Sequence, residues 1–380
     1  MFVQLKDEKE LLEEISSLGE ELNEKVYLVG GPARDKILNL PLKDIDIMVL
    51  GDGIRFAKEF AKRKKKRIKI FYEFLTAKID DLKIDFSTAR KEFYPEYGSL
   101  PVVSKGSFEE DARRRDFTIN AIYISLNKEN FCEVIDIVGG LNDLKNGLLR
   151  ILHNDSFKDD ATRILRGIRF IGRFGFRFDK DTEIKLNEDK VYLQNITFER
   201  ILRELLLLCE EEGKGFKWLK YYGIDDILNI KIPDERDKEE ILNFSRKHNI
   251  RPEKSLLLYL FFNDERLKIK EYRRNLNFIK NFPENRFDIN RILKIEKDFL
   301  PLIYVKFPFK EEIEKFIKLK NEIKTELNGE EIKSFGFPEK DCGRIKKEII
   351  EERWKGNIKN KKDEIDYLKR RLYEHRRNEK

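Results

Sequence analysis

Two aspartates that stand two positions apart are the first candidates for chemistry in this sequence. Asp44 and Asp46 alternate with Ile45 and Ile47, and this period of two predicts a β-strand. Because residues two apart on a strand point to the same face, both carboxylates would lie together. Carboxylate oxygens are the ligands that Mg²⁺ prefers, so the pair predicts a magnesium site. The alternative for an isolated pair is a solvated strand face.

A third candidate acid, Asp85, stands between Ile84 and Phe86 in an apolar, strand-like segment. Burying a carboxylate without a partner is costly. A bound metal ion would offset that cost, and so would an arginine such as Arg90. We therefore place Asp85 among the catalytic candidates and leave its partner open.

A glycine pair precedes the aspartates. Gly30 and Gly31 follow the apolar run 26–29, which is typical of a buried strand, and they open a predicted helix. Small residues there let backbone N–H groups approach a phosphate, and Arg34 would add a charge-assisted contact. The sequence contains neither a GxGxxG fingerprint nor a GxxxxGK[ST] loop. Taken alone, such a turn can be purely structural.

Two arginine-containing clusters follow. Arg113, Arg114 and Arg115 precede a predicted strand at 119–126, and arginine suits contacts with triphosphate and ribose. An exposed helix end is the alternative. Farther on, Asp160 and Arg163 are three residues apart, so they would be neighbours on one helix face. Such a pair can bind a nucleobase edge, and a simple salt bridge is the alternative.

The elements that must position these residues change in character along the chain. A helix is predicted over 7–24, and strands are predicted over 26–29, 44–49, 83–86, 119–126 and 134–138. After about residue 155 helical periodicity dominates. The sequence therefore predicts a mixed α/β region over 1–150 and a long helical region after it.

Composition narrows the possible classes of protein. The chain has 380 residues, 79 Lys and Arg against 72 Asp and Glu, a net charge of +7, and 40% apolar residues, enough for folded cores. Three Cys without CxxC spacing argue against a disulfide framework and a thiolate zinc site. The sequence has no apolar run long enough to predict a transmembrane helix, and its N-terminal residues lack a signal-peptide pattern. We therefore expect a cytoplasmic protein.

The motifs resemble, in order and spacing, the tRNA nucleotidyltransferase and poly(A) polymerase family. Within that family, the sequence resembles the bacterial-type (class II) CCA-adding enzymes. The matching segments are 28–35, 43–46, 114–121 and 163–170, with weaker matches at 197–200, 327–332 and 335–338. The resemblance implies an α+β fold, with a polymerase-beta-like mixed-sheet head followed by an all-α neck, body and tail. The implied bounds are 1–150 for the head, 151–212 for the neck, 213–306 for the body and 307–380 for the tail.

The resemblance also implies a role for each candidate residue. Asp44 and Asp46 would hold catalytic Mg²⁺. The residues expected to bind the triphosphate are Gly30, Gly31 and Arg34, and those expected near the sugar and phosphates are Arg115, Asp116 and Asn120. Asp160 and Arg163, supported by Arg166, would read the base edge of CTP or ATP. Asp159 departs from the family, which usually has Glu there.

The implied activity is addition of CCA, or part of it, to the 3′ end of tRNA without a nucleic-acid template. The helical body would grip the acceptor and TΨC arms by shape. Candidate tRNA contacts near the C-terminus are Arg370, Arg371, Arg376 and Arg377. The oligomeric state is left open.

Other functions are weighed against this one. An enzyme that adds only A or only CC, or a poly(A) polymerase, would share every motif, and the compact segment 91–101 does not decide between them. A non-catalytic RNA-binding protein is disfavoured because the acids and arginines of the motifs are intact. A small-molecule nucleotidyltransferase would have no need of the long helical region.

Overall fold

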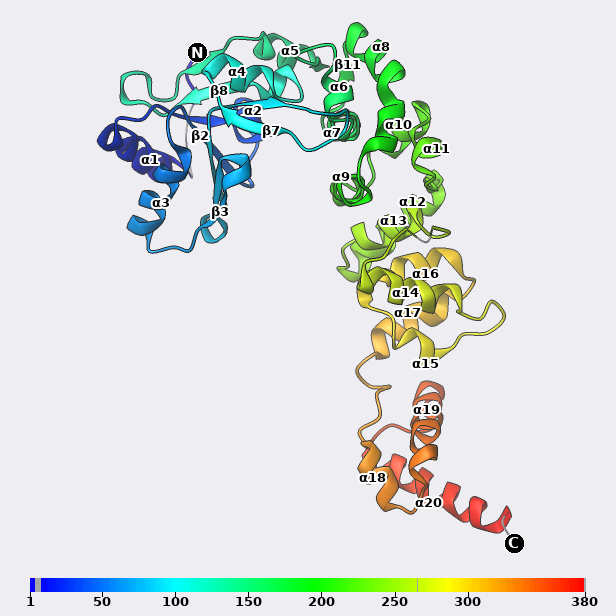
Figure 1. Ribbon diagram of the computed structural model, residues 1–380. Helices are drawn as coiled ribbons and strands as arrows, with labels where there is room; N and C mark the ends of the chain where they lie inside the picture. The colour runs from blue at the N-terminus through cyan, green and yellow to red at the C-terminus, as the bar shows by residue number, and fades with distance from the viewer. Residues whose placement is uncertain (4–7, 265, 379–380) are drawn as a thin grey trace. The chain divides into compact units, whose positions relative to one another are not determined.

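The computed structural model describes residues 1–3, 8–264 and 266–378 (Figure 1). The chain forms two compact units, Met1–Asn229 and Ile230–Lys380. The head and neck predicted from the sequence both lie within the first unit. The predicted boundaries at 212 and 306 do not coincide with the division between the units, and the four-part division stays a prediction.

The first unit is built on a seven-stranded mixed sheet, as the sequence predicts for this region. Its strand order is β3-β4-β5-β2-β1-β8-β9. The bounds are β1 Val26–Val29, β2 Ile45–Val49, β3 Lys69–Phe71, β4 Thr76–Ile79, β5 Ile84–Thr88, β8 Ile122–Ser125 and β9 Val134–Asp136. Strands β2 and β5 are parallel, and the other pairs are antiparallel.

The two faces of β2 have different neighbours. Ile45, Ile47 and Val49 join the core formed with helices α1 (Lys9–Leu22) and α3 (Gly53–Lys64). Met48 belongs to a separate cluster on the other face. Because side chains alternate along a strand, Asp46 shares the face of Met48 and points away from the α1 and α3 core. The strand begins at Ile45, so the prediction that Asp44 also lies on it is wrong.

Short elements complete the head on the Met48 face. Helix α2 (Gly30–Ile37) follows β1 directly, and helix α4 (Phe108–Arg113) carries a capping box at Ser107. The undecided segment 91–101 lies mostly within a hairpin of β6 (Arg90–Phe93) and β7 (Val102–Lys105). These elements frame the same side of the sheet as Asp46.

Helices predominate in the rest of the first unit. They are α5 Gly140–Asn146, α6 Ser156–Asp159, α7 Thr162–Phe174, α8 Lys180–Asp189, α9 Phe198–Glu210, α10 Phe216–Tyr221 and α11 Ile224–Leu228, with a small parallel pair of β10 Leu148–Leu149 and β11 Arg177–Phe178. Helix α7 is amphipathic, since Ile164, Leu165, Ile168 and Ile171 are buried. It packs against α9.

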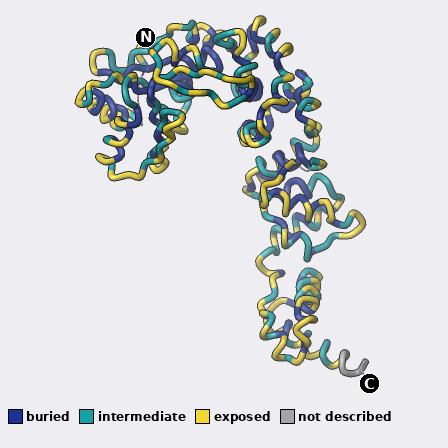
Figure 2. Tube along the Cα trace, in the orientation of Figure 1, coloured by how far each residue is buried: buried dark blue, intermediate teal, exposed yellow. Residues whose placement is uncertain are grey.

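The second unit contains only helices among its named elements. They are α12 Glu235–His248, α13 Glu253–Leu260, α14 Lys270–Lys280, α15 Ile289–Ile292, α16 Leu300–Lys306, α17 Lys310–Leu319, α18 Gly329–Ser334, α19 Glu339–Lys355 and α20 Lys361–Asn378. Buried and exposed positions alternate along them (Figure 2). Within the described residues, none of the helices of either unit is long and apolar enough to cross a membrane.

Candidate functional site

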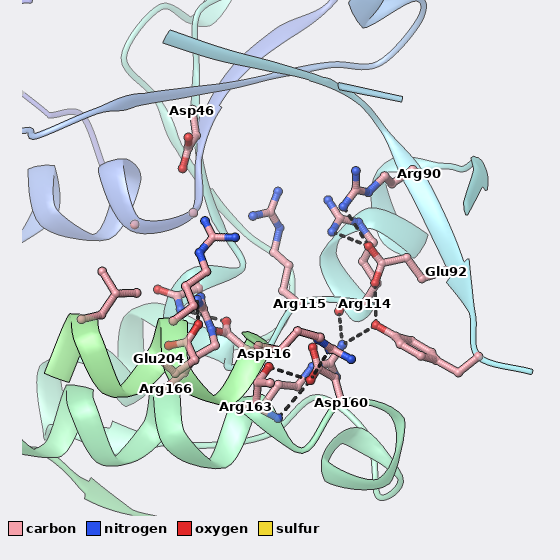
Figure 3. A pocket seen from close by; sticks show the side chains of 18 residues that line it. Asp46, Arg90, Glu92, Arg114, Arg115, Asp116, Asp160, Arg163, Arg166 and Glu204 are labelled. Carbon is pink, nitrogen blue, oxygen red and sulfur yellow. Dashed lines mark hydrogen bonds and ion pairs between the residues drawn. The ribbon is translucent and has the colours of Figure 1, made fainter. Parts of the chain in front are cut away.

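A cavity of about 550 Å³ in the first unit gathers most of the residues singled out in the sequence. Seven of its lining residues are arginines, which makes it suited to a polyanion. Figure 3 shows Asp46 apart from Asp160 and Arg163, with Arg115 between them. The lining residues are Gly30, Gly31, Asp46, Arg90, Glu92, Tyr94, Arg114, Arg115, Asp116, Asn120, Asp160, Thr162, Arg163, Arg166, Arg200, Arg203, Glu204 and Leu207.

The glycine pair forms the first turn of α2 at the cavity wall. Gly30 has a φ of +70°, a conformation that favours glycine. A Cβ atom at Gly30 would lie 3.4 Å from Arg115 Nη1 and 3.5 Å from Asp46 Oδ2. Val29 precedes the helix without a side-chain cap, so the first-turn N–H groups remain available to a ligand. This arrangement brings backbone donors, a carboxylate and a guanidinium to one place.

Asp46 and Asp85 are paired across β2 and β5, where they occupy the same register position. Burial, Asp85 and Asp44 together raise the pKa of Asp46 to about 6, against the opposing effect of Arg115. Burial also raises the pKa of Asp85. The carboxylates therefore repel one another at neutral pH, and a divalent cation would remove that repulsion.

The partner of Asp85 differs from the one considered in the sequence. Lys78 Nζ lies 3.2 Å from Asp85 Oδ1, because β4 places Lys78 opposite Asp85 in register. Arg90 instead donates hydrogen bonds to Glu92 and to the carbonyl of Phe74, so its suggested pairing with Asp85 is wrong. Lys78 donates its hydrogen bond to Asp85 Oδ2 at 3.3 Å, so the buried Oδ1 has Lys78 as an ion-pair neighbour but accepts no hydrogen bond from the described residues.

Asp44, Asp46 and Asp85 are the acids that could hold a metal ion at this site. Asp44 is exposed and does not line the cavity, although its charge acts on both Asp46 and Asp85. Across residues 1–3, 8–264 and 266–378, no three His, Cys, Asp or Glu side chains form a ready metal-binding group. The unbonded Asp85 oxygen and the mutual repulsion with Asp46 nevertheless fit a hard cation held by carboxylates.

Arg114 and Arg115 are anchored by an acid that sequence reasoning missed. Asp111 is fully buried, and its two oxygens lie 2.7 Å from Nη2 of Arg114 and Nη2 of Arg115. Tyr123 donates to the same carboxylate at 2.9 Å. The two arginines outweigh the effect of burial and hold the pKa of Asp111 well below its usual range. The spacing of three and four residues, from Asp111 in α4 to the two arginines just after the helix ends, is the signal that could have revealed Asp111.

The alternative of an exposed helix end is wrong for Arg114 and Arg115, whose side chains are 15% and 11% exposed. Arg113 is exposed and does not line the cavity. Because Asp111 already holds Arg115 beside Gly30, the binding of an anion costs little further side-chain entropy.

Asp116 and Asn120 line the cavity as expected. Asp116 accepts hydrogen bonds from Asn120 Nδ2 at 2.8 Å and from Arg166 Nε at 2.9 Å. Burial acts to raise the pKa of Asp116, but Arg166 and Asn120 outweigh it and hold this pKa at about 2. Arg166 thus supports Asp116 rather than Asp160.

Arg34 lies elsewhere. It is buried and does not line the cavity. It donates to Asp35 Oδ1 and, at 2.7 Å, to Asn120 Oδ1, and it packs over the Phe170 and Phe174 rings. Arg34 is therefore placed to orient Asn120. Its position does not support the expected direct contact with the triphosphate.

Asp160 and Arg163 both line the cavity, but the expected shared helix face is wrong. Asp160 has an extended backbone and lies before α7, which begins at Thr162. It accepts from Thr162 Oγ1 at 2.6 Å and pairs with Arg200 Nη2 at 2.8 Å. Among the described contacts no ion pair joins Asp160 to Arg163, so a simple salt bridge between them is also wrong.

Arg163 is held by a chain of hydrogen bonds. It is 5% exposed and donates to Ser156 Oγ at 2.7 Å and to the carbonyl of Arg114 at 2.9 Å. It also donates to the Tyr94 hydroxyl at 3.4 Å, and Tyr94 donates to Glu92 at 2.9 Å. Sequence reasoning missed Glu92 and Tyr94, which lie within or just after β6.

Residues 26–150 match the poly A polymerase head domain. The A-adding tRNA nucleotidyltransferase of Aquifex aeolicus is 32% identical over 373 residues, which cover 86% of this chain and 45% of that protein. A solved CCA-adding enzyme in an apo form matches 96% of both chains with a TM-score of 0.75 at 26% identity. Residues 26–150 thus match a poly A polymerase head domain, and the chain is similar over most of its length to tRNA nucleotidyltransferases and CCA-adding enzymes.

A third comparison concerns a tRNA nucleotidyltransferase solved with a primer tRNA and an incoming ATP analogue. It is 29% identical, has a TM-score of 0.63, and the match covers 82% of this chain and 99% of that one. The chain spans half or less of the length of the first curated relatives that it matches. Nucleotidyltransferases of this family generally use a divalent metal.

The predicted tRNA contacts lie in the second unit. Arg370 on α20 is exposed, whereas Arg371 pairs with Glu348 at 3.0 Å. The side chains of Arg376 and Arg377 lie outside the described residues. The structure therefore distinguishes an exposed cation from a paired one within the same helix.

Proposed function

We propose that this protein is a tRNA nucleotidyltransferase that adds CCA, or part of it, to the 3′ end of tRNA from CTP and ATP. One observation carries the proposal: a single cavity is lined by a buried carboxylate, an anchored arginine, and a second carboxylate and arginine that could bind a base edge. These are Asp46, Arg115, Asp160 and Arg163. The names of the relatives support the same reaction.

Asp46 and Asp85, with Asp44 nearby, would hold Mg²⁺. When bound, Mg²⁺ would lower the pKa of the attacking hydroxyl and neutralise the triphosphate. The expected transfer forms a bond between the RNA 3′ oxygen and the α-phosphorus, and it breaks the bond to pyrophosphate. The hydroxyl proton passes to solvent, and no covalent intermediate with the protein is required.

The side chains of the cavity contribute position and charge. Arg115 and the first-turn N–H groups of α2 bind the triphosphate, and Asp116 with Asn120 lies near the sugar. The Asp160 carboxylate accepts hydrogen bonds from the base, and Arg163 donates to it. Because Ser156, Tyr94 and the Arg114 carbonyl hold Arg163, its donors have a fixed direction.

Addition of the terminal adenosine alone is the second candidate. Three relatives named A-adding tRNA nucleotidyltransferases are 40%, 32% and 38% identical to this chain. Relatives named CCA-adding or CC-adding are 31–36% identical. Two of the A-adding relatives exceed that range, and the third is similar over 373 residues rather than 209–226, which favours the A-adding reaction within the wider proposal.

The test uses three tRNAs that lack the whole CCA end, its last two nucleotides, or only the terminal adenosine. Each is incubated with Mg²⁺ and either CTP or ATP, and products are resolved to one nucleotide. Extension of the first tRNA by CTP supports CCA or CC addition, and extension of only the third by ATP supports A addition. Long adenosine tails would indicate a poly(A) polymerase, and no extension would contradict the proposal.

We further propose that the helical second unit binds the acceptor and TΨC arms by their shape and that the protein acts in the cytoplasm, where tRNA and nucleotides meet. Neutral substitution of exposed arginines such as Arg370 tests the first point, because phosphate contacts set the salt dependence of binding.

A further inference from the structure

Three side chains behind the cavity form a relay that ends at Asn120. Arg173 Nη2 lies 3.2 Å from Asp35 Oδ2, and Asp35 Oδ1 accepts hydrogen bonds from Nε and Nη2 of Arg34 at 2.8 Å and 2.6 Å. Arg34 Nη1 in turn donates to Asn120 Oδ1 at 2.7 Å. Asn120 lines the cavity, whereas the other three residues do not. The relay therefore reaches a ligand only through the Asn120 amide.

The relay joins two helices of the first unit. Arg34 and Asp35 belong to α2, and Arg173 lies in the last turn of α7. Arg34 is 3% exposed, and its guanidinium lies 4.9 Å and 4.8 Å from the centres of the Phe170 and Phe174 rings. Because these groups are packed and shielded from water, their hydrogen bonds have few competing partners. The relay therefore fixes the side chain at its end.

The Asn120 amide has only one orientation that suits both of its neighbours. A guanidinium can only donate hydrogen bonds, and an ionised carboxylate can only accept them. Arg34 therefore faces the amide oxygen, and the amide nitrogen faces Asp116, to which it donates at 2.8 Å. The second Nδ2 hydrogen of Asn120 has no acceptor among the described contacts. It is the group of Asn120 that a ligand in the cavity can use.

The oxygens of Asp116 are already engaged by protein donors. Its Oδ1 accepts from the N–H of Phe117 and from Asn120, both at 2.8 Å. Its Oδ2 accepts from Arg166 Nε at 2.9 Å, and Arg166 Nη2 lies 2.8 Å away. A carboxylate has about four acceptor positions, so two donors at each oxygen occupy them. Asn120 is therefore better placed than Asp116 to form a hydrogen bond with a sugar.

We propose that Arg34, held by Asp35 and Arg173, is a positioning residue that directs the second N–H of Asn120 to a sugar hydroxyl oxygen of the incoming nucleotide. The assignment rests on the proposed function. An analogue without that hydroxyl leaves the Asn120 N–H without its acceptor, which disfavours the analogue. The relay thus sets the preference for the complete ribose, although none of its three residues touches the nucleotide.

The test compares kcat/KM for the nucleotide that the protein adds, CTP or ATP, with kcat/KM for its 2′-deoxy and 3′-deoxy analogues. The unsubstituted protein should prefer the complete ribose to at least one analogue by about tenfold or more, which is the factor that a single hydrogen bond contributes. In Arg34→Met this preference should fall about tenfold, because the Asn120 amide is no longer held in one orientation. Arg34→Lys keeps a buried donor and should retain most of the preference.

Lys36→Met is the matched control. Lys36 belongs to the same helix and its side chain is 10% exposed, but its Nζ lies 2.7 Å from Glu8 and it does not line the cavity. Its removal costs α2 an ion pair without changing the contacts of Asn120. The preference for the complete ribose should therefore be unchanged.

Equal kcat/KM for the nucleotide and both analogues in the unsubstituted protein would overturn the assignment. So would an Arg34→Met protein that loses activity toward all three by the same factor, because Arg34 would then only support the fold. If Arg34→Met does not fold, Arg173→Met decides, since its side chain is 24% exposed. The preference should fall there too, and an unchanged preference would overturn the assignment.

Failure of the proposed function is a separate outcome. If the unsubstituted protein extends no RNA under any of the conditions above, the proposed function itself fails. The two failures are distinct, because the preference for the complete ribose is measured only in an enzyme that transfers nucleotides.

Discussion

Asp46 and Asp85 occupy the same register position on the parallel strands β2 and β5. The 38 residues between them in sequence include helix α3 and strands β3 and β4, so only the sheet topology brings them together. Each is buried enough for its pKa to rise, and Asp85 contributes to the rise at Asp46. This relationship makes the pair the centre of the proposed chemistry.

Replacement of Asp85 should weaken metal-dependent transfer. In Asp85→Asn we expect the Mg²⁺ concentration for half-maximal activity to rise by about tenfold or more, because one charged ligand is lost. Initial rates over a Mg²⁺ titration measure this. Asp81→Asn, at an exposed acid on the turn before β5, is the control and should behave like the unsubstituted protein. An unchanged Mg²⁺ requirement in Asp85→Asn would contradict the assignment.

The raised pKa of Asp46 predicts a pH-dependent stability in the absence of divalent cations. With a pKa of about 6, the folded protein protonates Asp46 more easily than the unfolded chain does. Proton binding therefore favours the folded state at low pH. This contribution to stability is lost as pH rises from about 4 to 6. Asp46→Asn should therefore gain stability relative to the unsubstituted protein over this range, by up to roughly 3 kcal/mol.

Denaturant unfolding in EDTA at pH 4 and pH 7 measures this difference. Added Mg²⁺ at pH 7 should reduce it, because the cation stabilises only the form with both carboxylates. A stability difference that is the same at both pH values would show that Asp46 is not under this electrostatic strain.

Substitution of Asp160 or Arg163 should weaken nucleotide selectivity more than transfer as such. Asp160→Ala and Arg163→Ala each remove hydrogen-bonding groups from the base edge, and the loss of discrimination should be about tenfold or more. The ratio of kcat/KM for ATP to that for UTP or GTP measures this selectivity. If the ratio is unchanged in both variants, these residues do not read the base.

A buried ion pair in the second unit should be important for stability. Arg353 Nε lies 2.6 Å from Oε1 of Glu364, whose side chain is fully buried and also accepts hydrogen bonds from the N–H groups of Glu326 and Leu327. In Arg353→Met we expect the second unit to lose about 3–5 kcal/mol, because Glu364 is left buried without a cation. Chemical denaturation measures the loss, and Lys355→Met on the exposed side of α19 should change little.

Arg370 and Arg371 offer a comparison of tRNA contacts. Arg370 is exposed, whereas Arg371 is paired with Glu348. Arg370→Gln should reduce the slope of log Kd against log salt concentration by about one, and Arg371→Gln should reduce it less. Filter binding over a range of salt concentrations distinguishes them. Equal slopes for Arg370→Gln and the unsubstituted protein would remove Arg370 from the interface.

Local periodicity was sufficient to predict much of the fold and several site residues. The apolar alternation around Asp46 identified β2, and helical spacing identified α7, because in both cases one face is buried. The resemblance to a known family supplied the roles of Asp116, Asn120 and Arg163, and the cavity contains all three.

What the sequence could not provide depends on contacts between distant segments. Lys78 meets Asp85 through the register of β4 and β5, and Arg200 of α9 pairs with Asp160, which lies 40 residues earlier in the sequence. Arg34 was expected at the triphosphate, but the Phe170 and Phe174 rings of α7 cover it. Such pairings depend on strand order and helix packing, which a pattern of residue types does not specify.

The most direct test of the central claim is transfer of labelled AMP to a tRNA that lacks only its terminal adenosine, with the unsubstituted protein and with Asp46→Asn at pH 8 and saturating Mg²⁺. The account predicts one added nucleotide with the unsubstituted protein and a loss of at least about a hundredfold in kcat with Asp46→Asn. Folding of the variant is confirmed by its unfolding transition. Near-normal transfer by a folded Asp46→Asn protein would contradict the account.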